Sequence, residues 1–149
     1  MTPRVRLFAQ PLAVWERDGI RAALNGAGLP TFDVESPAVS CWRFDQDDVP
    51  VGFGGLEIHG RDALLRSLVT LPVLRGQGYG RAVVSMLEAE AELQGCGRVY
   101  LLAAAAPEFF ARLGYRQCER SELPEPMRRN ALFSALCPPD TIAMVKQLS

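Results

Sequence analysis

The chain has 149 residues, of which 48% are hydrophobic and 22% are charged, and its formal net charge at pH 7 is −1. A near-neutral charge argues against broad nucleic-acid binding, which needs a basic field, and no apolar run approaches the length that spans a bilayer. The N-terminus lacks an apolar core of signal-peptide length. We therefore expect one globular domain over residues 1–149, in the cytoplasm, without nucleic-acid or membrane partners.

The cysteine and histidine content predicts no metal site. Cys41, Cys96, Cys118 and Cys137 form no Cys-x-x-Cys pair, and His59 is the single histidine. Zinc sites need closely spaced ligands of these types. In a reducing compartment we expect four free thiols, some of them buried. Thiols that folding brings together around a metalloid are the alternative, although nothing in their spacing suggests it.

Hydrophobic periodicity predicts several strands and one helix in the first half of the chain. The helix, over residues 12–27, should bury Trp15, Ile20, Ala23 and Leu24, and it ends at a segment rich in glycine and proline. Short polar residues at 45–48 predict a hairpin tip, residues 60–62 a second turn, and the glycines at 52, 54 and 55 a bulge or bend. The predicted strands occupy residues 4–9, 39–44, 49–58 and 64–71.

The second half of the chain predicts further alternation of helices and strands. Val83, Met86, Leu87 and Ala91 lie on one stripe of an amphipathic helix that follows residue 80. Strands are predicted over residues 98–102, 115–119 and 141–145, and short helices over 107–113 and within 123–135. This order of elements predicts an α/β fold, in which a mixed sheet carries helices on both faces.

The connection between the strand at 64–71 and the helix after it carries the strongest functional signal. The run Arg75-Gly76-Gln77-Gly78-Tyr79-Gly80 places three glycines and an arginine at a helix N-terminus. Free N–H groups and the helix dipole favour an anion there, and glycine lets the main chain touch it. A P-loop would need Lys-Ser or Lys-Thr, and a dinucleotide fingerprint would need a third glycine or alanine at positions that Arg81 or Val83 occupy. The run therefore predicts a different pyrophosphate site.

The spacing of Arg75, Gly78 and Gly80 resembles Arg/Gln-x-x-Gly-x-Gly/Ala, the acyl-CoA loop of the GCN5-related N-acetyltransferases (GNAT). The segment 107–115 resembles the family's helix followed by Gly-Phe/Tyr, and 51–57 resembles its third strand. The resemblance implies the GNAT fold in a single domain, with a mostly antiparallel sheet, one splayed strand pair, and acetyl-CoA as cosubstrate. The cofactor residues that it implies are the backbone of Leu68, Val69 and Thr70 and the loop of Arg75, Gly76, Gln77, Gly78, Tyr79, Gly80 and Arg81.

Within this superfamily the chain resembles small acetyltransferases encoded with arsenic-resistance genes. The segments that carry this resemblance are 28–31, 55–57, 63–68, 109–115 and 136–138. Such members often have threonines where this chain has alanines at 103–105. The name of the branch reflects genetic neighbourhood and does not establish an arsenic substrate.

Two positions depart from the common family pattern. Many members place a tyrosine beside the departing sulfur, where this chain has Phe110, and an asparagine that bonds the pantetheine arm, where it has Ala103. A phenyl ring cannot donate a proton, so water would serve as the acid or the thiolate would leave unprotonated. A non-catalytic CoA-binding or metabolite-sensing relative is therefore the alternative to an enzyme.

Two charged residues in apolar strands are candidates for the acceptor site. Glu57 is the candidate general base, with a solvated strand residue as the equal alternative. Arg66 lies mid-strand among leucines, where a charge must be paired or face a cleft, and arginine suits planar anions. An internal pair with Glu57 is the alternative role. His59 lies nearer the turn and is interpreted as a surface residue.

Together these features predict an N-acetyltransferase that moves the acetyl group of acetyl-CoA to the amine of a small, amino-acid-like substrate. Arg66 favours a substrate with an acidic group, and the branch resemblance suggests resistance to arsenic or toxic analogues. Acetylation of proteins is a weaker alternative, because no acidic stretch for a basic peptide is evident. A homodimer is an open alternative to a monomer.

Overall fold

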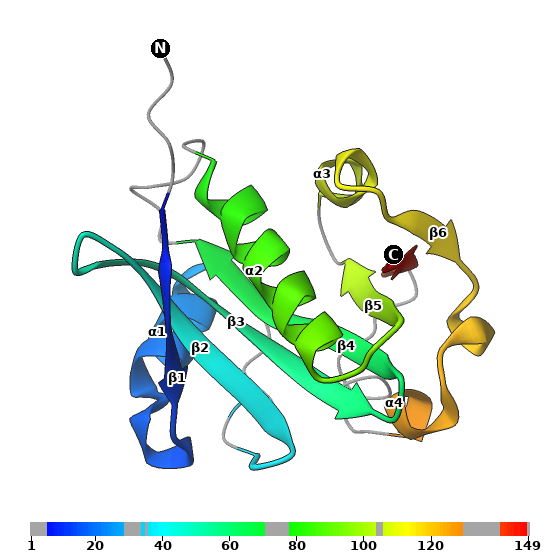
Figure 1. The fold of residues 1–149 in the computed structure, drawn as a ribbon, viewed down its shortest axis with the longest axis horizontal. Helices are drawn as coiled ribbons and strands as arrows, with labels where there is room; N and C mark the ends of the chain where they lie inside the picture. The colour runs from blue at the N-terminus through cyan, green and yellow to red at the C-terminus, as the bar shows by residue number, and fades with distance from the viewer. Residues whose placement is uncertain are drawn as a thin grey trace.

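The computed structural model describes residues 6–28, 34, 36–70, 78–103, 106–129 and 141–148. These residues form seven strands in one sheet, with helices packed against it (Figure 1). The strands are β1 (Phe8–Leu12), β2 (Val39–Gln46), β3 (Val49–His59), β4 (Asp62–Thr70), β5 (Arg98–Ala103), β6 (Arg116–Cys118) and β7 (Ile142–Gln147). The helices are α1 (Asp18–Gly26), α2 (Tyr79–Leu93), α3 (Pro107–Arg112) and α4 (Glu125–Arg129), with short 3₁₀ turns η1 (Val14–Glu16) and η3 (Arg120–Glu122).

The sheet is mixed, as the order of elements predicted. Its strand order is β1-β2-β3-β4-β5-β7-β6. Every neighbouring pair is antiparallel except β4 and β5, which run parallel because α2 carries the chain across between them. The predicted turn at 60–62 joins β3 and β4 as a hairpin, and the predicted tip between β2 and β3 is a two-residue turn at Asp47 and Asp48.

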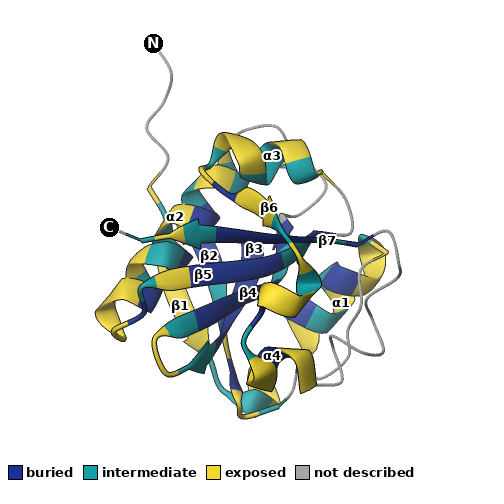
Figure 2. Ribbon diagram, turned by 90° about the vertical axis from the view of Figure 1, so that its right-hand side faces the viewer, coloured by how far each residue is buried: buried dark blue, intermediate teal, exposed yellow. Residues whose placement is uncertain are grey.

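Helices cover both faces of the sheet, as predicted. Successive residues of a strand point to opposite faces, so the neighbours Leu64 and Leu65 separate the two layers. Leu65 belongs to a buried cluster that includes α2 residues and borders α3, whereas Leu64 belongs to one that includes Met127 of α4. A further cluster, with Ile20 of α1, shares the face of Leu64. Figure 2 shows buried central strands between helices whose outer surfaces are exposed.

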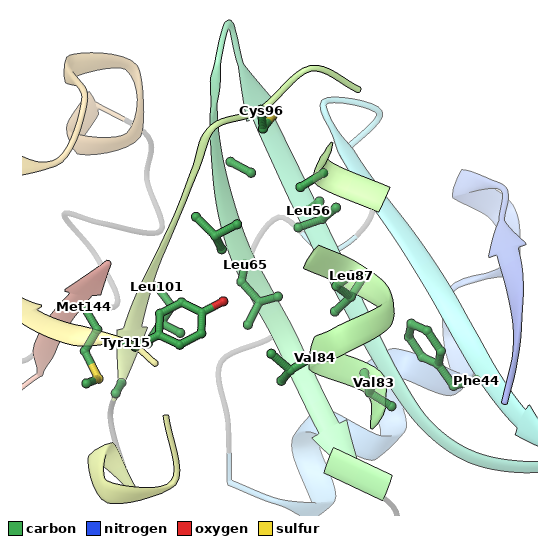
Figure 3. Packing of buried hydrophobic residues seen from close by; sticks show 14 of the residues in the cluster. Phe44, Leu56, Leu65, Val83, Val84, Leu87, Cys96, Leu101, Tyr115 and Met144 are labelled. Atoms are coloured by element: carbon green, nitrogen blue, oxygen red, sulfur yellow. The ribbon is translucent and has the colours of Figure 1, made fainter. Parts of the chain in front are cut away.

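α2 packs closely on the sheet because β3 has a glycine beneath it. A Cβ atom at Gly54 would lie 2.6 Å from Cδ1 of Leu87, closer than two carbon atoms approach. Leu87, Val83 and Val84 are buried against this part of the sheet (Figure 3). Gly54 therefore sets the height at which α2 crosses β3, and with it the position of the helix N-terminus.

The N-terminal predictions were partly wrong. The first strand in the described residues is Phe8–Leu12, whereas the sequence predicted 4–9; residues 4 and 5 of that prediction lie outside the described residues. The predicted helix at 12–27 is split into η1 and α1 at Arg17. Trp15 is 84% exposed, because it lies on the 3₁₀ turn and not on the buried stripe of α1, whereas Ile20 and Leu24 are buried as predicted.

The remaining elements lie close to their predicted positions. Val83, Leu87 and Ala91 of the predicted stripe are buried, and Met86 packs partly buried against the same cluster. The predicted strands 115–119 and 141–145 are observed as β6 and β7, shifted by one or two residues. In the part of the chain that the structure describes, no helix combines the length and apolar character needed to cross a membrane.

Candidate active site

The parallel strands β4 and β5 separate in the middle of the sheet. Their pairing runs from Asp62 opposite Arg98 to Leu65 opposite Leu101, yet β4 continues to Thr70 and β5 to Ala103. Figure 3 shows the strands that carry Leu65 and Leu101 running apart. Divergence leaves one backbone edge of β4 without its strand neighbour, so an extended ligand can pair with it. This is the splayed strand pair that the resemblance implied.

A bulge in β4 marks the point of separation. Gly55 of β3 pairs with Arg66 of β4, and Phe53 of β3 pairs with Val69 of β4. From the first pair to the second, β3 advances by two residues and β4 by three. The extra residue is Ser67 or its neighbour, and Ser67 alone in β4 has a left-handed φ of 57°. A bulge bends and twists its strand, so this one turns the C-terminal half of β4 away from β5. The glycines at 52, 54 and 55 had predicted a bulge or bend in β3, whereas this bulge lies in the neighbouring strand β4.

The loop before α2 is only partly within the described residues. Arg75, Gly76 and Gln77 lie outside them, whereas Gly78 to Arg81 lie inside. Gly78 is exposed and has a φ of 84°, a conformation that glycine adopts without strain. It precedes a helix of 15 residues whose first-turn N–H groups have no carbonyl partner within the helix.

These backbone features fit an acyl-CoA cosubstrate. The helix N-terminus and Arg81 could hold the pyrophosphate, since the dipole and the N–H groups both favour an anion. The backbone of Leu68, Val69 and Thr70 lies in the part of β4 that has left β5, where a pantetheine arm could pair with it. Leu68 packs on the α2 face and Val69 on the α1 face. The roles of these residues in binding stay predictions.

Glu57 and Arg66 form a buried ion pair. Nη1 of Arg66 lies 3.3 Å from Oε2 of Glu57, and the two side chains are 3% and 7% exposed, respectively. Arg66 directly follows Leu65, the last residue of β4 that pairs with β5. On its other side, Arg66 pairs with Gly55 of β3. The antiparallel neighbourhood predicted for the two charged residues is therefore present, as is the alternative of an internal pair.

The pair lies on the face of the sheet opposite to α2. In the ladder, Glu57 is opposite Leu64 of the cluster beneath α4 and opposite Val39 of the cluster beneath α1. The charges therefore separate two apolar clusters. Desolvating two charges is costly even when they meet, and apolar residues at these positions would avoid that cost. The placement of charge here is consistent with a role beyond packing.

His59 extends this pair toward the surface. Its Nε2 atom lies 2.9 Å from Oε1 of Glu57, so each carboxylate oxygen of Glu57 contacts a different basic side chain. The His59 side chain is 27% exposed. The expectation of a surface residue was therefore incomplete, because His59 touches the candidate base. The alternation of β3 carried the signal, since residues 57 and 59 share a face.

An aromatic group lies at the other end of the diverging strands. Phe110 of α3 meets Phe109 and Tyr115 edge to face, with ring centroids 5.1 Å and 6.0 Å apart. Ala103, at the end of β5, is buried in the same cluster. Phe110 thus offers an apolar ring, and Ala103 a small buried side chain, at the two positions where the family resemblance had led us to expect polar groups.

A polar network ties this aromatic group to α2. The phenol of Tyr115 donates a hydrogen bond of 2.8 Å to Glu88, and Lys146 donates to the same carboxylate at 3.0 Å. Burial, and then the Glu88 carboxylate, raise the pKa of Tyr115 well above its ordinary value of 10.0. The sequence had no signal for this network, because its members lie on α2, on the segment between α3 and β6, and on β7, which are distant along the chain.

Arg17 is a second buried charge that sequence reasoning missed. Its guanidinium donates to the backbone carbonyls of Leu12, Val34 and Ser36, at 3.2 Å, 3.0 Å and 2.9 Å for the nearest atoms. It therefore binds the segments on either side of α1 to each other. The sequence around Arg17 contains no pattern that indicates this role, because a single arginine next to a helix is usually exposed.

The described cysteines are free thiols. Burial raises the pKa of the Cys41, Cys96 and Cys118 thiols above the ordinary value of 9.0, so each is a poor thiolate at neutral pH. Within the described ranges, no three His, Cys, Asp or Glu side chains come together as a metal site. Cys137 lies outside these ranges.

Comparison with known proteins agrees with this architecture. Residues 37–117, more than half of the chain, match the model of the acetyltransferase (GNAT) domain. An uncharacterized N-acetyltransferase of Chlorobaculum tepidum, CT2212, is 36% identical over 90 residues, which cover 58% of this chain and 56% of the relative. The match thus spans little more than half of that protein.

Solved structures share the fold at low sequence identity. N-acetylglutamate synthase from Neisseria gonorrhoeae, complexed with coenzyme A and N-acetyl-glutamate, aligns with a TM-score of 0.80 at 18% identity, over 99% of this chain and 36% of that one. Rv2747 from Mycobacterium tuberculosis, in complex with CoA, aligns with a TM-score of 0.77 at 20% identity, over 95% of this chain and 99% of that one. With the domain match, they lead to one conclusion: this chain belongs to the GNAT acetyltransferase family.

Proposed function

We propose that this chain is an acetyl-CoA-dependent N-acetyltransferase whose acceptor is the amine of a small, acidic, amino-acid-like molecule. The observation that carries the proposal is the position of the Glu57–Arg66 pair at the separation of β4 and β5. The cofactor loop leads into α2 on one face of the sheet, and the pair lies on the other face. A thioester held between the strands would meet an amine that approaches from the side of the pair.

The chemistry requires the amine to lose a proton before it attacks. Acetyl-CoA supplies an activated acetyl group as its thioester. Glu57 would accept the ammonium proton, directly or through water, so that the nitrogen can form its bond to the acetyl carbon while the carbon–sulfur bond breaks. The second N–H proton, released as the amide forms, goes to the departing thiolate or to water. Backbone N–H groups of β4 at the separation are suited to polarise the thioester carbonyl.

Arg66 is suited to an anionic group on the substrate. A guanidinium has five N–H donors in a planar fork, so it can contact Glu57 and a second carboxylate or a phosphinate-like group together. The likeness to N-acetylglutamate synthase, solved with N-acetyl-glutamate, supports an amino-acid acceptor. That alignment covers only 36% of the synthase. The proposal that the substrate is acidic therefore depends on Arg66 and not on the synthase.

The finer parts of the proposal rest on resemblance. The likeness of the chain to acetyltransferases encoded with arsenic-resistance genes suggests an arsenical or phosphinic amino-acid analogue as one acceptor to test. The free cysteines suit the cytoplasm, where thiols stay reduced. A homodimer stays a prediction.

A non-catalytic CoA-binding or metabolite-sensing protein is the second candidate. Phe110 favours it, because the ring packed between Phe109 and Tyr115 cannot protonate a leaving thiolate. Ala103 removes a polar contact that many relatives make with the pantetheine arm. Both candidates bind the cofactor, and only the first turns it over.

Two measurements separate these candidates. Calorimetric titration with acetyl-CoA should give saturable binding, and CoA release against a panel of amino acids and their arsenical and phosphinic analogues should identify an acceptor. Binding without release on any acceptor would favour the sensing protein. No binding at millimolar acetyl-CoA would overturn both.

A matched pair of glycines tests the loop. Gly78 and Gly95 stand at opposite ends of α2 with φ values of 84° and 89°, so alanine brings similar backbone strain to each. Gly78→Ala should weaken acetyl-CoA binding by at least about tenfold, equivalent to about 1.4 kcal/mol, whereas Gly95→Ala should not. Equal effects of the two changes would contradict the loop assignment.

A further inference from the structure

We propose that His59 is a proton relay between the buried Glu57 carboxylate and solvent. This inference rests on the proposed acetyl transfer, in which Glu57 takes the amine proton. It adds a step that the transfer requires and that Glu57 cannot complete alone. A base that is 5% exposed must pass its proton on before the next turnover.

Among the described residues, the geometry supplies a short route outward. Glu57 Oε2 faces Arg66, which stays charged and cannot accept a proton. Oε1 lies 2.9 Å from Nε2 of His59, within the distance of direct proton transfer. The imidazole is 27% exposed at the end of β3, so it can exchange a proton with water. Arg66, Glu57 and His59 therefore form a line from the strand separation to the surface.

The charges around His59 suit a group that gains and loses a proton. Glu57 contacts it from its own strand, and Asp62 stands opposite it on β4. Asp62 is in turn 3.3 Å from Arg98 of β5, which offsets part of its charge. Arg61 is exposed in the adjoining turn. Histidine is the side chain whose ordinary titration range lies around neutral pH.

The relay balances over one turnover. The ammonium N–H bond breaks and its proton binds Glu57. The carboxyl O–H bond then breaks as the proton binds Nε2 of His59, giving an imidazolium ion beside a carboxylate. The imidazolium ion loses a proton to water, which leaves as a hydronium ion. Exchange of the ring proton with water then returns the tautomer in which Nε2 is free to accept, so imidazole and carboxylate are restored.

Two substitutions separate proton transfer from structural support. His59→Gln keeps a side-chain amide that can bond Glu57 but cannot carry a proton, and His59→Ala opens space for a small base. Arg61→Gln is the matched control, because it removes an exposed charge from the same turn. Initial rates of CoA release are measured with each variant, with and without added imidazole.

The relay predicts a specific pattern of kinetics. His59→Gln and His59→Ala should each lower kcat by at least about tenfold, within the range typical of acid–base groups. The Michaelis constants for acetyl-CoA and the acceptor should change little. Added imidazole should restore much of the rate of His59→Ala, with a dependence on the fraction of neutral imidazole. Arg61→Gln should keep the rate of the original protein.

Other outcomes would overturn the relay. Full turnover by His59→Gln, or a loss that imidazole does not restore in a folded His59→Ala protein, would assign His59 a structural role. These results differ from failure of the proposed function, in which the unsubstituted protein releases no CoA on any acceptor.

The contact itself can be tested without activity. Because the chain has one histidine, its imidazole signals in an NMR spectrum are assigned without mutagenesis. The change Glu57→Gln should shift these signals, because Nε2 of His59 lies 2.9 Å from the carboxylate that the change alters. Unchanged signals would show that Glu57 and His59 do not interact in solution, which would overturn the relay.

Discussion

The phenol of Tyr115 and the carboxylate of Glu88 meet at 2.8 Å, although the two residues are 27 positions apart along the chain. Lys146 of β7 binds the same carboxylate and lies 5.7 Å from the centre of the Tyr115 ring. The contact therefore links α2, which begins at the proposed cofactor loop, to the segment that follows α3. Phe110 lies on α3. The two parts of the proposed cosubstrate site share this support.

Loss of the Tyr115 hydroxyl should destabilise the fold. We expect Tyr115→Phe to lower the free energy of unfolding by about 1.5–3 kcal/mol, the range for a hydrogen bond to a charged group. Urea unfolding followed by circular dichroism measures the change. Lys146→Met in the same background tests coupling, since both residues bind Glu88. A stability equal to that of the original protein would mean that water replaces the phenol without cost.

Alkaline pH should destabilise the protein through the same residue. Burial raises the pKa of folded Tyr115 above the ordinary value of 10.0, so above pH 10 the unfolded chain loses this proton while the folded protein holds it. The free energy of unfolding then falls as pH rises, by at most about 1.4 kcal/mol per pH unit for one group. Cys41, Cys96 and Cys118 act in the same direction from about pH 9. Chemical unfolding between pH 8 and 11 should show a shallower decline for Tyr115→Phe, and an identical decline would contradict the assignment.

The Glu57–Arg66 pair should be replaceable for folding and required for activity. Glu57→Gln or Arg66→Gln removes one partner of a buried ion pair, a change that typically costs about 3–5 kcal/mol. The double change Glu57→Leu with Arg66→Met should recover most of that loss, because apolar clusters flank both positions. Urea unfolding and CoA release measured on all three variants test this. An active double variant would remove both residues from the chemistry.

The bulge in β4 should contain releasable strain. Ser67 has a φ of 57°, a conformation that costs a non-glycine residue about 1–2 kcal/mol. Ser67→Gly should therefore raise the free energy of unfolding by up to about 1 kcal/mol, the remainder being lost to the greater freedom of glycine in the unfolded chain. Ser67→Ala is the control, since it keeps the strain and removes the hydroxyl. If glycine and alanine have the same effect, the left-handed conformation is not a source of strain.

A tyrosine at position 110 should be tolerated. Phe110 is half-buried and meets two aromatic rings by their edges. Phe110→Tyr introduces the hydroxyl that the family resemblance implies at this position, so kcat for CoA release should rise or stay unchanged, with acetyl-CoA affinity unaffected. A large loss of turnover with intact binding would show that the apolar ring has another role, such as shaping the acceptor site.

Much of the frame around the site follows from local sequence signals. Apolar alternation in two segments joined by the short turn at 60–62 made β3 and β4 antiparallel neighbours, because a tight hairpin fixes its register. That register brought Glu57 close to Arg66. Gly78, whose left-handed conformation suits only glycine without strain, marked the start of α2. These features depend on residues near one another in the chain, which is why pattern and spacing were sufficient.

Only the tertiary structure decided how the charged groups are used. The sequence placed Arg66 among leucines, but the register between β4 and β5 put it at the point where the strands separate. It identified His59 and Glu57 as neighbours on one strand face, but packing determined that they touch and that one is buried while the other reaches solvent. Trp15 and Arg17 show the same limit, because the apolar residue is exposed and the charged one is buried. Burial and pairing depend on which distant segments meet, and these contacts form only when the whole sheet and its helices are assembled.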